Sequence, residues 1–372
     1  MSALDPVILS QVSTVAAGVA DLQSRPQGAT PVGAMALLPS EAPVVTIGEQ
    51  VYLRAGVAAP RASYPGFPTD VPQSAVGAVW DEVALPKAHI TAGIVHGNGV
   101  FVAVSSNQGV SLVSAGGKAW TEHSMPGAFS GIAFGNGVFV AVRVGSSSSI
   151  ATSPDGKTWT ARSLPESLDA SGIAFGNGTF VIAAKGATKA ATSPDGVTWT
   201  SRVTPSAASS LVFGNGVFIG TGPRNWMRSA DGVTWTGGSI SSHTTSWTGS
   251  VVAFGNGVFM VASTSTPDVA VSQDGASWVA ATGLGANAVR IGFAAGRFYL
   301  STAAMTGSSY RGDVWMRNPM DIPKATNAVL SAVADDGGVV VAGFNAAAAY
   351  MYRSGDVIGA AEYKQYHYVR VK

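Results

Sequence analysis

A six-residue stretch, "FGNGVF", recurs along this 372-residue chain, in some copies with changed letters. Its second glycine stands at Gly99, Gly137, Gly178, Gly216, Gly257, Gly296 and Gly338. Neighbouring copies are 38–42 residues apart, a period typical of repeat architectures. Asn-Gly between two apolar runs predicts a β-hairpin with a type I′ turn, because both central residues of that turn need a positive φ.

A series of tryptophans has the same count but a different phase. Its members are Trp80, Trp120, Trp159, Trp199, Trp235, Trp278 and Trp315. Each repeat contains four short strand patterns, which is the unit of a β-propeller blade. The first Trp precedes the first glycine and no Trp follows the last, so we expect the strand at Trp80 to complete the blade built by residues 331–358. The sequence therefore predicts an all-β, seven-bladed propeller over residues 77–358.

The tryptophans end an eight-residue stretch that reads "SPDGKTWT" at positions 153–160. A carboxylate in such a turn can accept backbone N–H groups, and the indole can pack on the neighbouring blade. The pattern resembles the Asp box of sialidases and of many non-enzymatic propellers, with one residue fewer between Asp and Gly. The resemblance implies a structural role, on the face opposite an active site, for Asp155, Asp195, Asp231, Asp274, Trp159, Trp199, Trp235 and Trp278. Since each box offers one carboxylate far from the next, no metal site is expected.

Glycan cleavage is an alternative function that the sialidase resemblance raises. The resemblance implies that a sialidase-like site would have three arginines around the axis of the propeller, a Tyr-Glu pair and an Asp that acts as the acid. The blades hold only three glutamates: Glu82, Glu122 and Glu166. The carboxylates expected in loops opposite the boxes come from scattered blades: Glu166, Asp169, Asp268 and Asp321. A glycosidase needs a carboxylate pair across one cleft, and the chain also has no cysteine, P-loop or HExxH motif, so we expect no enzyme activity and no cofactor.

The face opposite the boxes is expected to carry the variable loops, where binding sites concentrate. Its longest loop, residues 237–250, holds His243 and Trp247, and Trp247 belongs to neither repeat series. An exposed Trp247 would stack on a sugar ring, whereas the alternative is that it fills the core of its own loop. The other candidate glycan-binding residues are Arg224, Trp226, Tyr310 and Arg311.

The N-terminal segment predicts an oligomerising helix over residues 1–24. Asp5 is a suitable N-cap and Pro6 suits the first helical position. A heptad seam of apolar, mostly β-branched residues follows, at Ile8, Val12, Val15, Val19 and Leu22. Such a helix is too short to stand alone, and its seam favours a homotrimer. A single helix docked on another protein is the alternative.

Both chain ends are expected to meet outside the ring. Residues 25–76 predict a Pro/Ala-rich connector with a small β module, and residues 359–372 predict a C-terminal strand that packs with the 43–60 region. "GEQVYLRAGVAAPRASYP" and "YHYVRVK" resemble segments of bacteriophage tail-fibre and tail-tip proteins, where they flank propeller or glycan-binding modules. The resemblance implies a virion subunit, located in the phage tail, that contacts other tail proteins through the helix.

The charge of the chain narrows the choice of partners. A net charge of +1 gives no field to attract nucleic acid, and no apolar run is long enough to insert into a membrane. We therefore expect a tail-fibre or receptor-binding protein that attaches to host surface polysaccharide through the variable-loop face. The alternatives are a structural tail decoration that binds other virion proteins, and the glycan-cleaving enzyme considered above.

Overall fold

The computed structural model divides the chain into two compact units, residues 1–75 with 357–372, and residues 76–356. It describes residues 35–38, 44–47, 50–54, 80–143, 145–240, 247–281, 283–294, 296–303, 306–309, 316–317, 330–335, 340–344, 348–354 and 366–370. All regular structure in these residues is β-strand, and none of them forms a helix that could cross a membrane. The predicted helix over residues 1–24, with its seam from Ile8 to Leu22, lies outside the described residues.

The first unit contains one small antiparallel sheet, in the order β1-β31-β3-β2. Its strands are β1 (Met35–Leu38), β2 (Val44–Ile47), β3 (Gln50–Arg54) and β31 (Tyr366–Arg370). The C-terminal strand β31 lies between β1 and β3, with Val369 opposite both Met35 and Leu53. Strands from the two ends of the chain therefore form one sheet.

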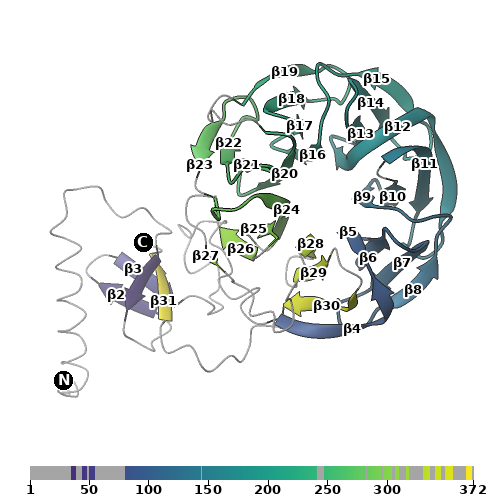
Figure 1. The fold of residues 1–372 in the computed structure, drawn as a ribbon. Helices are drawn as coiled ribbons and strands as arrows, with labels where there is room; N and C mark the ends of the chain where they lie inside the picture. The colour runs from purple at the N-terminus through teal and green to yellow at the C-terminus, as the bar shows by residue number, and fades with distance from the viewer. Residues whose placement is uncertain are drawn as a thin grey trace, which may run out of the picture. The chain divides into compact units, whose positions relative to one another are not determined.

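The second unit is a ring of antiparallel sheets, and the first strand of each sheet lies nearest the centre (Figure 1). The first four-stranded sheet contains β5 (Thr91–Gly97), β6 (Val100–Ser105), β7 (Val110–Ser114) and β8 (Thr121–Ser124). A seven-stranded sheet follows, with β9 (Gly131–Gly135), β10 (Val138–Val142), β11 (Gly145–Ser153), β12 (Thr160–Gly176), β13 (Thr179–Ala184), β14 (Lys189–Ser193) and β15 (Thr200–Val203). The long strand β12 pairs with β11 through its first part and with β13 through its last part.

Three further four-stranded sheets continue the ring. One contains β16 (Ser210–Gly214), β17 (Val217–Thr221), β18 (Asn225–Ser229) and β19 (Thr236–Ser239). The next contains β20 (Ser250–Gly255), β21 (Val258–Ser263), β22 (Val269–Ser272) and β23 (Val279–Ala281). The third contains β24 (Ala288–Ala294), β25 (Arg297–Thr302), β26 (Thr306–Ser309) and β27 (Met316–Arg317).

The last sheet joins strands from both ends of the second unit. It contains β28 (Leu330–Asp335), β29 (Val340–Phe344), β30 (Ala348–Ser354) and β4 (Trp80–His89). In its register Ser354 lies opposite Trp80 and Met351 lies opposite Val83. This is the pairing that the phase difference between the two repeat series predicts. Because β4 pairs with β30, the edge of β30 that would otherwise be open is paired and the ring is closed.

The Asn-Gly hairpins have the predicted backbone conformation. The five asparagines have φ between 45° and 49°, and the glycines that follow them have φ between 73° and 76°. They are Asn98, Asn136, Asn177, Asn215 and Asn256. Positive φ at both central residues defines the type I′ turn, which confirms the turn assignment and explains why these two residue types recur.

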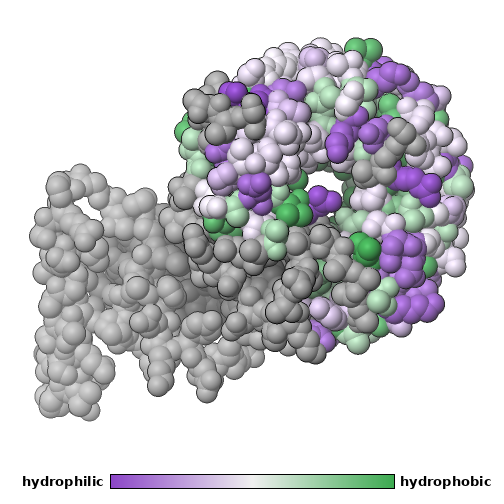
Figure 2. All heavy atoms as spheres, in the orientation of Figure 1, coloured by the Kyte–Doolittle hydropathy of each residue, from purple (hydrophilic) through white to green (hydrophobic). Residues whose placement is uncertain are grey.

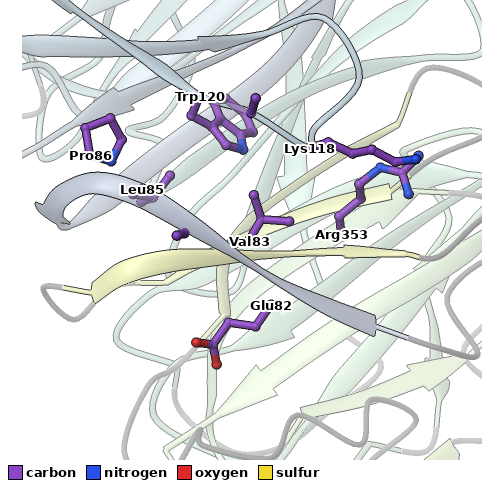
Figure 3. A pocket seen from close by; sticks show the side chains of 9 residues that line it. Glu82, Val83, Leu85, Pro86, Lys118, Trp120 and Arg353 are labelled. Carbon is purple, nitrogen blue, oxygen red and sulfur yellow. The ribbon is translucent and has the colours of Figure 1, made fainter.

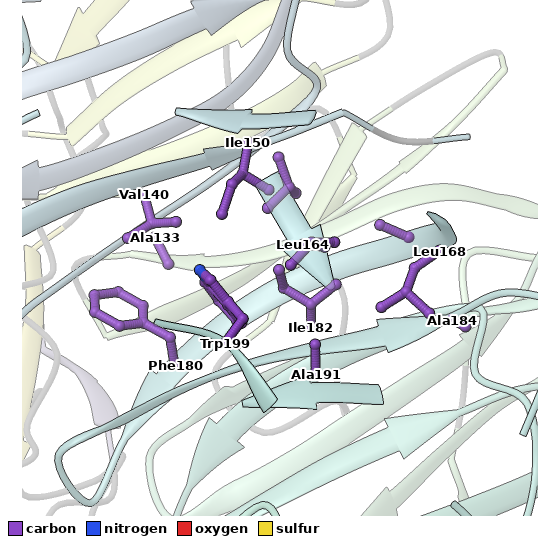
Figure 4. Packing of buried hydrophobic residues seen from close by; sticks show 12 residues of the cluster. Ala133, Val140, Ile150, Leu164, Leu168, Phe180, Ile182, Ala184, Ala191 and Trp199 are labelled. Atoms are coloured by element: carbon purple, nitrogen blue, oxygen red, sulfur yellow. The ribbon is translucent and has the colours of Figure 1, made fainter. Parts of the chain in front are cut away.

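The core lies between neighbouring sheets or sheet halves rather than in one central cluster. Figure 4 shows one such layer, in which Val140 and Ile150 from β10 and β11 pack with Phe180 and Ile182 of β13 and with Trp199. The second strand of each regular repeat supplies a fully buried phenylalanine: Phe101, Phe139, Phe180, Phe218, Phe259 and Phe298. Burial of such side chains contributes roughly 2–3 kcal/mol each.

Neighbouring innermost strands interlock through glycine and phenylalanine. A Cβ at Gly135 would lie 2.1 Å from Cγ of Phe175, and one at Gly176 would lie 2.1 Å from Cδ2 of Phe213. The phenylalanine before each hairpin therefore sits on the glycine of the preceding repeat. The repeated "FG" is explained by this packing, since any larger residue would displace the ring.

Candidate functional site

The Ser-x-Asp-Gly turns, named here for residues 153–156, 193–196, 229–232 and 272–275, are held by their own side chains. In the second of these turns, Asp195 Oδ1 accepts the backbone N–H groups of Val197 and Thr198, both at 2.8 Å, and the Ser193 hydroxyl at 2.9 Å. The Ser193 hydroxyl in turn accepts the N–H of Gly196 at 2.8 Å. The N–H groups of Thr198 and Val197 hold the pKa of Asp195 below its ordinary value. These carboxylates stabilise turns and hold no proton for acid catalysis.

Three of the four tryptophans that end these turns also have a local partner. The indole N–H groups of Trp159, Trp199 and Trp235 donate to the carbonyl of the turn glycine at 2.9–3.0 Å. The glycine is needed for a second reason, because a Cβ at Gly156 would lie 2.4 Å from Cγ2 of Val102 in the preceding sheet. Shape and packing therefore account for the whole motif.

The hairpin asparagines make a contact that the sequence pattern did not reveal. The side-chain amide of Asn177 donates to the carbonyls of Gly216 and Ala230, which belong to the hairpin and the Ser-x-Asp-Gly turn of the next repeat, at 2.9 and 2.8 Å. Asn98, Asn136 and Asn215 bridge the corresponding carbonyls in the same way. We name the side of the ring that carries these hairpins and turns the turn face. The asparagine and aspartate side chains of the turn face already form hydrogen bonds that stabilise the fold.

Trp247 is a core residue, and the expectation that it stacks on a glycan is wrong. Its side chain is only 4% exposed and packs with Val217, Ile240 and Trp278. Its indole N–H donates to Asp268 Oδ2 at 3.0 Å. The alternative interpretation, that Trp247 fills the core of its own loop, is the one that the structure supports.

The structure describes two of the other candidate glycan-binding residues, Trp226 and Arg224. Trp226, on β18, is half-buried and lies over Gly238 of β19, where a Cβ would be 2.7 Å from its ring. Arg224 is half-buried in the short β17–β18 connection with a φ of 56°. His243, Tyr310 and Arg311 lie outside the described residues.

Two of the candidate loop carboxylates, Glu166 and Asp268, are bonded to side chains other than a second carboxylate. Glu166 forms an ion pair with Lys189, and Asp268 accepts hydrogen bonds from Trp247 and Thr266. Asp321 lies outside the described residues. Across the part of the chain that the structure describes, no three His, Asp or Glu side chains are arranged to hold a metal ion.

A groove of about 570 Å³ lies where β4 meets the first sheet (Figure 3). It is lined by Glu82, Val83, Ala84, Leu85, Pro86, Lys118, Ala119, Trp120 and Arg353. The buried Arg353 donates from Nε to the Gly116 carbonyl at 2.8 Å, and the Trp120 indole donates to the Gly117 carbonyl at 3.1 Å. Arg353 therefore joins the last sheet to the first, whereas the Trp120 bond lies within the β7–β8 connection of the first sheet.

A buried histidine lies at the end of β4. His89 Nε2 is 3.3 Å from Glu122 Oε2, and Lys87 Nζ is 3.5 Å from the other oxygen of Glu122. Burial lowers the pKa of His89, although Glu122 acts in the opposite direction, so the imidazole is neutral at pH 7. Because the ring is inaccessible to solvent, it is unsuited to proton transfer with a substrate.

Comparisons with known proteins bear on the fold of the second unit. No protein-family model and no curated protein sequence matches the chain. Among solved structures, virginiamycin B lyase from Staphylococcus aureus, solved with quinupristin, aligns with a TM-score of 0.63 at 14% identity over 74% of this chain and 98% of that chain. YCF48 bound to D1 peptide aligns with a TM-score of 0.56 at 14% identity over 74% and 96%.

A third similar structure is a propeller by description. The WD40 β-propeller domain of Doa1 aligns with a TM-score of 0.53 at 10% identity over 74% of this chain and 95% of that chain. These proteins include a lyase and a peptide-bound protein, so the similarity does not choose between catalysis and binding. It does agree with the ring of antiparallel sheets, and the second unit of this chain has a β-propeller fold.

Proposed function

We propose that this protein is a non-catalytic, receptor-binding subunit of a phage tail that attaches to host surface polysaccharide through one face of its propeller. In this proposal the ring is a seven-bladed propeller with Asp-box turns, and the seven-stranded sheet is two blades that share β12. The observation that carries the proposal is the difference between the two faces of the ring.

The turn face is uniform. Its hairpin connections have two residues each, at 98–99, 136–137, 177–178, 215–216 and 256–257. The asparagine amides bridge neighbouring repeats, and the aspartates accept backbone N–H groups of their own turns. A surface whose polar groups already have partners has little hydrogen-bonding capacity left for a ligand.

The opposite side of the ring, which we name the loop face, varies from repeat to repeat. The connections between second and third strands are residues 106–109, 185–188, 222–224 and 264–268. They read "SNQG", "KGAT", "GPR" and "TSTPD", and they expose polar residues such as Asn107, Lys185 and Thr264. Variable loops on a rigid scaffold are the usual location of binding residues.

The phage assignment depends on the resemblance of both chain ends to tail-fibre segments. The predicted N-terminal helix would join the protein to other tail proteins and assemble three copies. Several propellers on one tail would raise the effective affinity for a repeating polysaccharide, even where each site binds weakly.

An array of purified bacterial surface polysaccharides tests this proposal. We apply the parent chain and three single variants to the array. Lys185→Glu and Thr264→Trp change the loop face, and Lys157→Glu on the turn face is the matched charge-reversal control. We expect binding to at least one polysaccharide, weakened about tenfold by the loop-face changes because each removes or blocks one polar contact. Equal binding by all variants would refute the loop face as the binding surface.

The same experiment separates the rival functions. A structural tail decoration would bind none of the polysaccharides but would bind isolated tail proteins. A glycan-cleaving enzyme would shorten the bound polysaccharide, which size-exclusion chromatography after overnight incubation detects. We expect unchanged polysaccharide length.

A further inference from the structure

The third strand of one sheet carries an aromatic residue at a position where the other repeats do not. On β18 this residue is Trp226, three residues before the serine that ends the strand. The same position on the other third strands holds residues without an aromatic ring: Ser111, Ile150, Ala190, Val269, Thr306 and Met351. Trp226 therefore breaks the repeat at a point where the backbone is regular.

The residue opposite Trp226 on the outermost strand has changed with it. In the register of the sheet, Trp226 lies opposite Gly238 of β19. A Cβ at Gly238 would lie 2.7 Å from Cζ2 of the indole and 3.1 Å from its Nε1. Four other repeats have a side chain at the position of this glycine: His123, Arg162, Arg202 and Ala281. The glycine leaves room for the indole to lie over the outermost strand.

The indole is only partly enclosed by the ring. Trp226 packs against the cluster that contains Ile240, Trp247 and Trp278, yet it remains half-buried. All four residues of β19 beside it are exposed. Figure 2 shows mostly pale atoms over this part of the ring, the colour of residues with intermediate hydropathy. Part of the aromatic surface therefore lies at an outer rim that carries little charge.

The strand β19 places hydrogen-bonding groups beside the indole. It is the last strand of its sheet, and no strand of the described residues pairs with its outer edge. Alternate residues of such an edge direct their N–H and C=O groups outwards. Because two of the four residues are Gly237 and Gly238, few side-chain atoms cover these groups. The outermost strands β8 and β15 instead carry the charged residues Glu122 and Arg202.

The tryptophan of the next repeat shows that packing alone does not favour Trp226. The Trp159 indole donates to the hydroxyl of Ser111, the equivalent of Trp226 in its sheet, at 2.9 Å, and to the carbonyl of its own turn glycine. Nε1 of Trp278 is buried without a hydrogen-bond partner among the described residues. A buried donor without a partner costs stability. Trp226 is therefore not explained as an improved core residue.

We propose that Trp226 and the exposed edge of β19 at Gly237 and Gly238 form a binding site, the rim site, for an uncharged hexopyranose ring of the host polysaccharide. This inference rests on the proposed function and names the chemical class of its glycan. The C–H face of the sugar packs on the indole, and the sugar hydroxyls bond to backbone groups of β19. Trp226 follows the connection at residues 222–224 closely, so the rim site adjoins the loop face.

A titration with methyl glycosides of D-glucose, D-galactose and D-mannose tests the rim site directly. The full chain is labelled with ¹⁵N, and the indole Nε1–H resonance of Trp226 is assigned by its loss in Trp226→Phe. Glycerol is the control probe, because it has hydroxyl groups but no sugar ring. We expect at least one glycoside to shift this resonance with a dissociation constant of about 1–10 mM, and glycerol to leave it in place.

A double variant removes the rim site with a residue pair that the chain already uses. Trp226→Ile with Gly238→Arg copies the cross-strand pair of Ile150 and Arg162. It should fold, because the same pair packs in that sheet, and it should weaken glycoside binding, followed by backbone resonances of β19, at least tenfold. Trp226→Phe keeps an aromatic face and should retain weaker binding.

The matched control is Trp235→Phe, which changes a half-buried tryptophan on the turn face and should leave glycoside binding unchanged. The inference is overturned if no glycoside shifts the Trp226 resonance or if glycerol shifts it equally. It is also overturned if the double variant binds as tightly as the parent, or if Trp235→Phe weakens binding as much as the double variant does.

The outcome is distinguishable from that of the polysaccharide array. If array polysaccharides bind, the double variant leaves every one of them unaffected and no glycoside shifts the Trp226 resonance, the receptor-binding function stands and the rim site fails. If glycosides bind at Trp226 while no array polysaccharide binds, the rim site stands and the receptor-binding function fails.

Discussion

Neighbouring innermost strands pack differently in two parts of the ring. One part is the regular repeats, from β9 to β23, and the other is the closing region, from β24 to β30 with β4. In the regular repeats, Gly135 and Gly176 each accommodate a phenylalanine ring of the next repeat. In the closing region, Ala294 replaces that glycine and Asp335 replaces the next phenylalanine. Ala294 is fully buried, so its methyl group fills part of the volume that the ring would occupy. The two positions change together because they share one space.

The hydrogen bonds between repeats differ in the same way. Asn136, Asn177 and Asn215 each bridge two carbonyls of the next repeat. In the closing region the equivalent residues are Ala295 and Gly337, which have no side-chain amide. The ring is closed there by strand pairing of β4 with β30 and by Arg353 bonding to the Gly116 carbonyl. The regular repeats are therefore joined by the same asparagine contacts, whereas the closing region is joined by residues that occur only once in the chain.

Gly135→Ala tests this comparison and should have the largest effect on stability. The new methyl group would overlap the Phe175 ring, so we expect a loss of about 3 kcal/mol in the free energy of unfolding. The reverse change in the closing region, Ala294→Gly, should cost only about 1 kcal/mol because it removes a methyl group without overlap. Urea unfolding of both variants, followed by tryptophan fluorescence, measures the difference. Equal losses would mean that the two positions are packed alike.

Asn177→Ala should have the next largest effect. It removes two hydrogen bonds to the next repeat and puts alanine at a positive φ, which together cost about 2 kcal/mol. Asn177→Gly keeps the backbone conformation free of strain and loses only the bonds, so it should cost about 1 kcal/mol. If Asn177→Gly is as stable as the parent in urea unfolding, the bridges contribute nothing and only the turn conformation matters.

The Ser-x-Asp-Gly turns should make the regular repeats sensitive to strong acid. Because the folded protein lowers the pKa of Asp195, its stabilising effect is present above the unfolded pKa and is lost as the pH falls below about 4. Asp195→Asn should cost about 1 kcal/mol at pH 7 and less at pH 3, where the parent has lost part of this contribution. Thermal unfolding at both pH values measures this, and a pH-independent difference would contradict it.

The closing region should respond to milder acid, with the smallest effect. The lowered pKa of His89 means that the unfolded chain binds a proton more readily, so stability is full above about pH 6.5 and falls as the pH drops below it. Hydrogen exchange of β4 amides should become faster relative to β13 between pH 7 and pH 5.5, after correction for intrinsic rates. His89→Gln should abolish this relative change. An unaltered ratio in the parent would show that protonation of His89 is not coupled to the closing sheet.

Prediction from the sequence worked best where the local backbone conformation alone requires a particular residue type. Asn-Gly between apolar runs predicts a type I′ turn, and all five such turns have the required φ angles. The sequence did not reveal that the same asparagines bridge repeats, because that contact joins residues 39–58 apart in the chain. The candidate site was less predictable. Trp247 stood out because it breaks the pattern, but an isolated Trp in a polar loop can point either way.

The sequence by itself determined the period of the repeat, the hairpin turns and the offset that brings Trp80 opposite Ser354, since each of these depends on local conformation or on counting. Only the tertiary structure decided that Trp247 is core and that the turn-face asparagines and aspartates have partners. The physical reason is that burial and partnership arise between strands from distant parts of the chain, where no local pattern specifies which surface a side chain will meet.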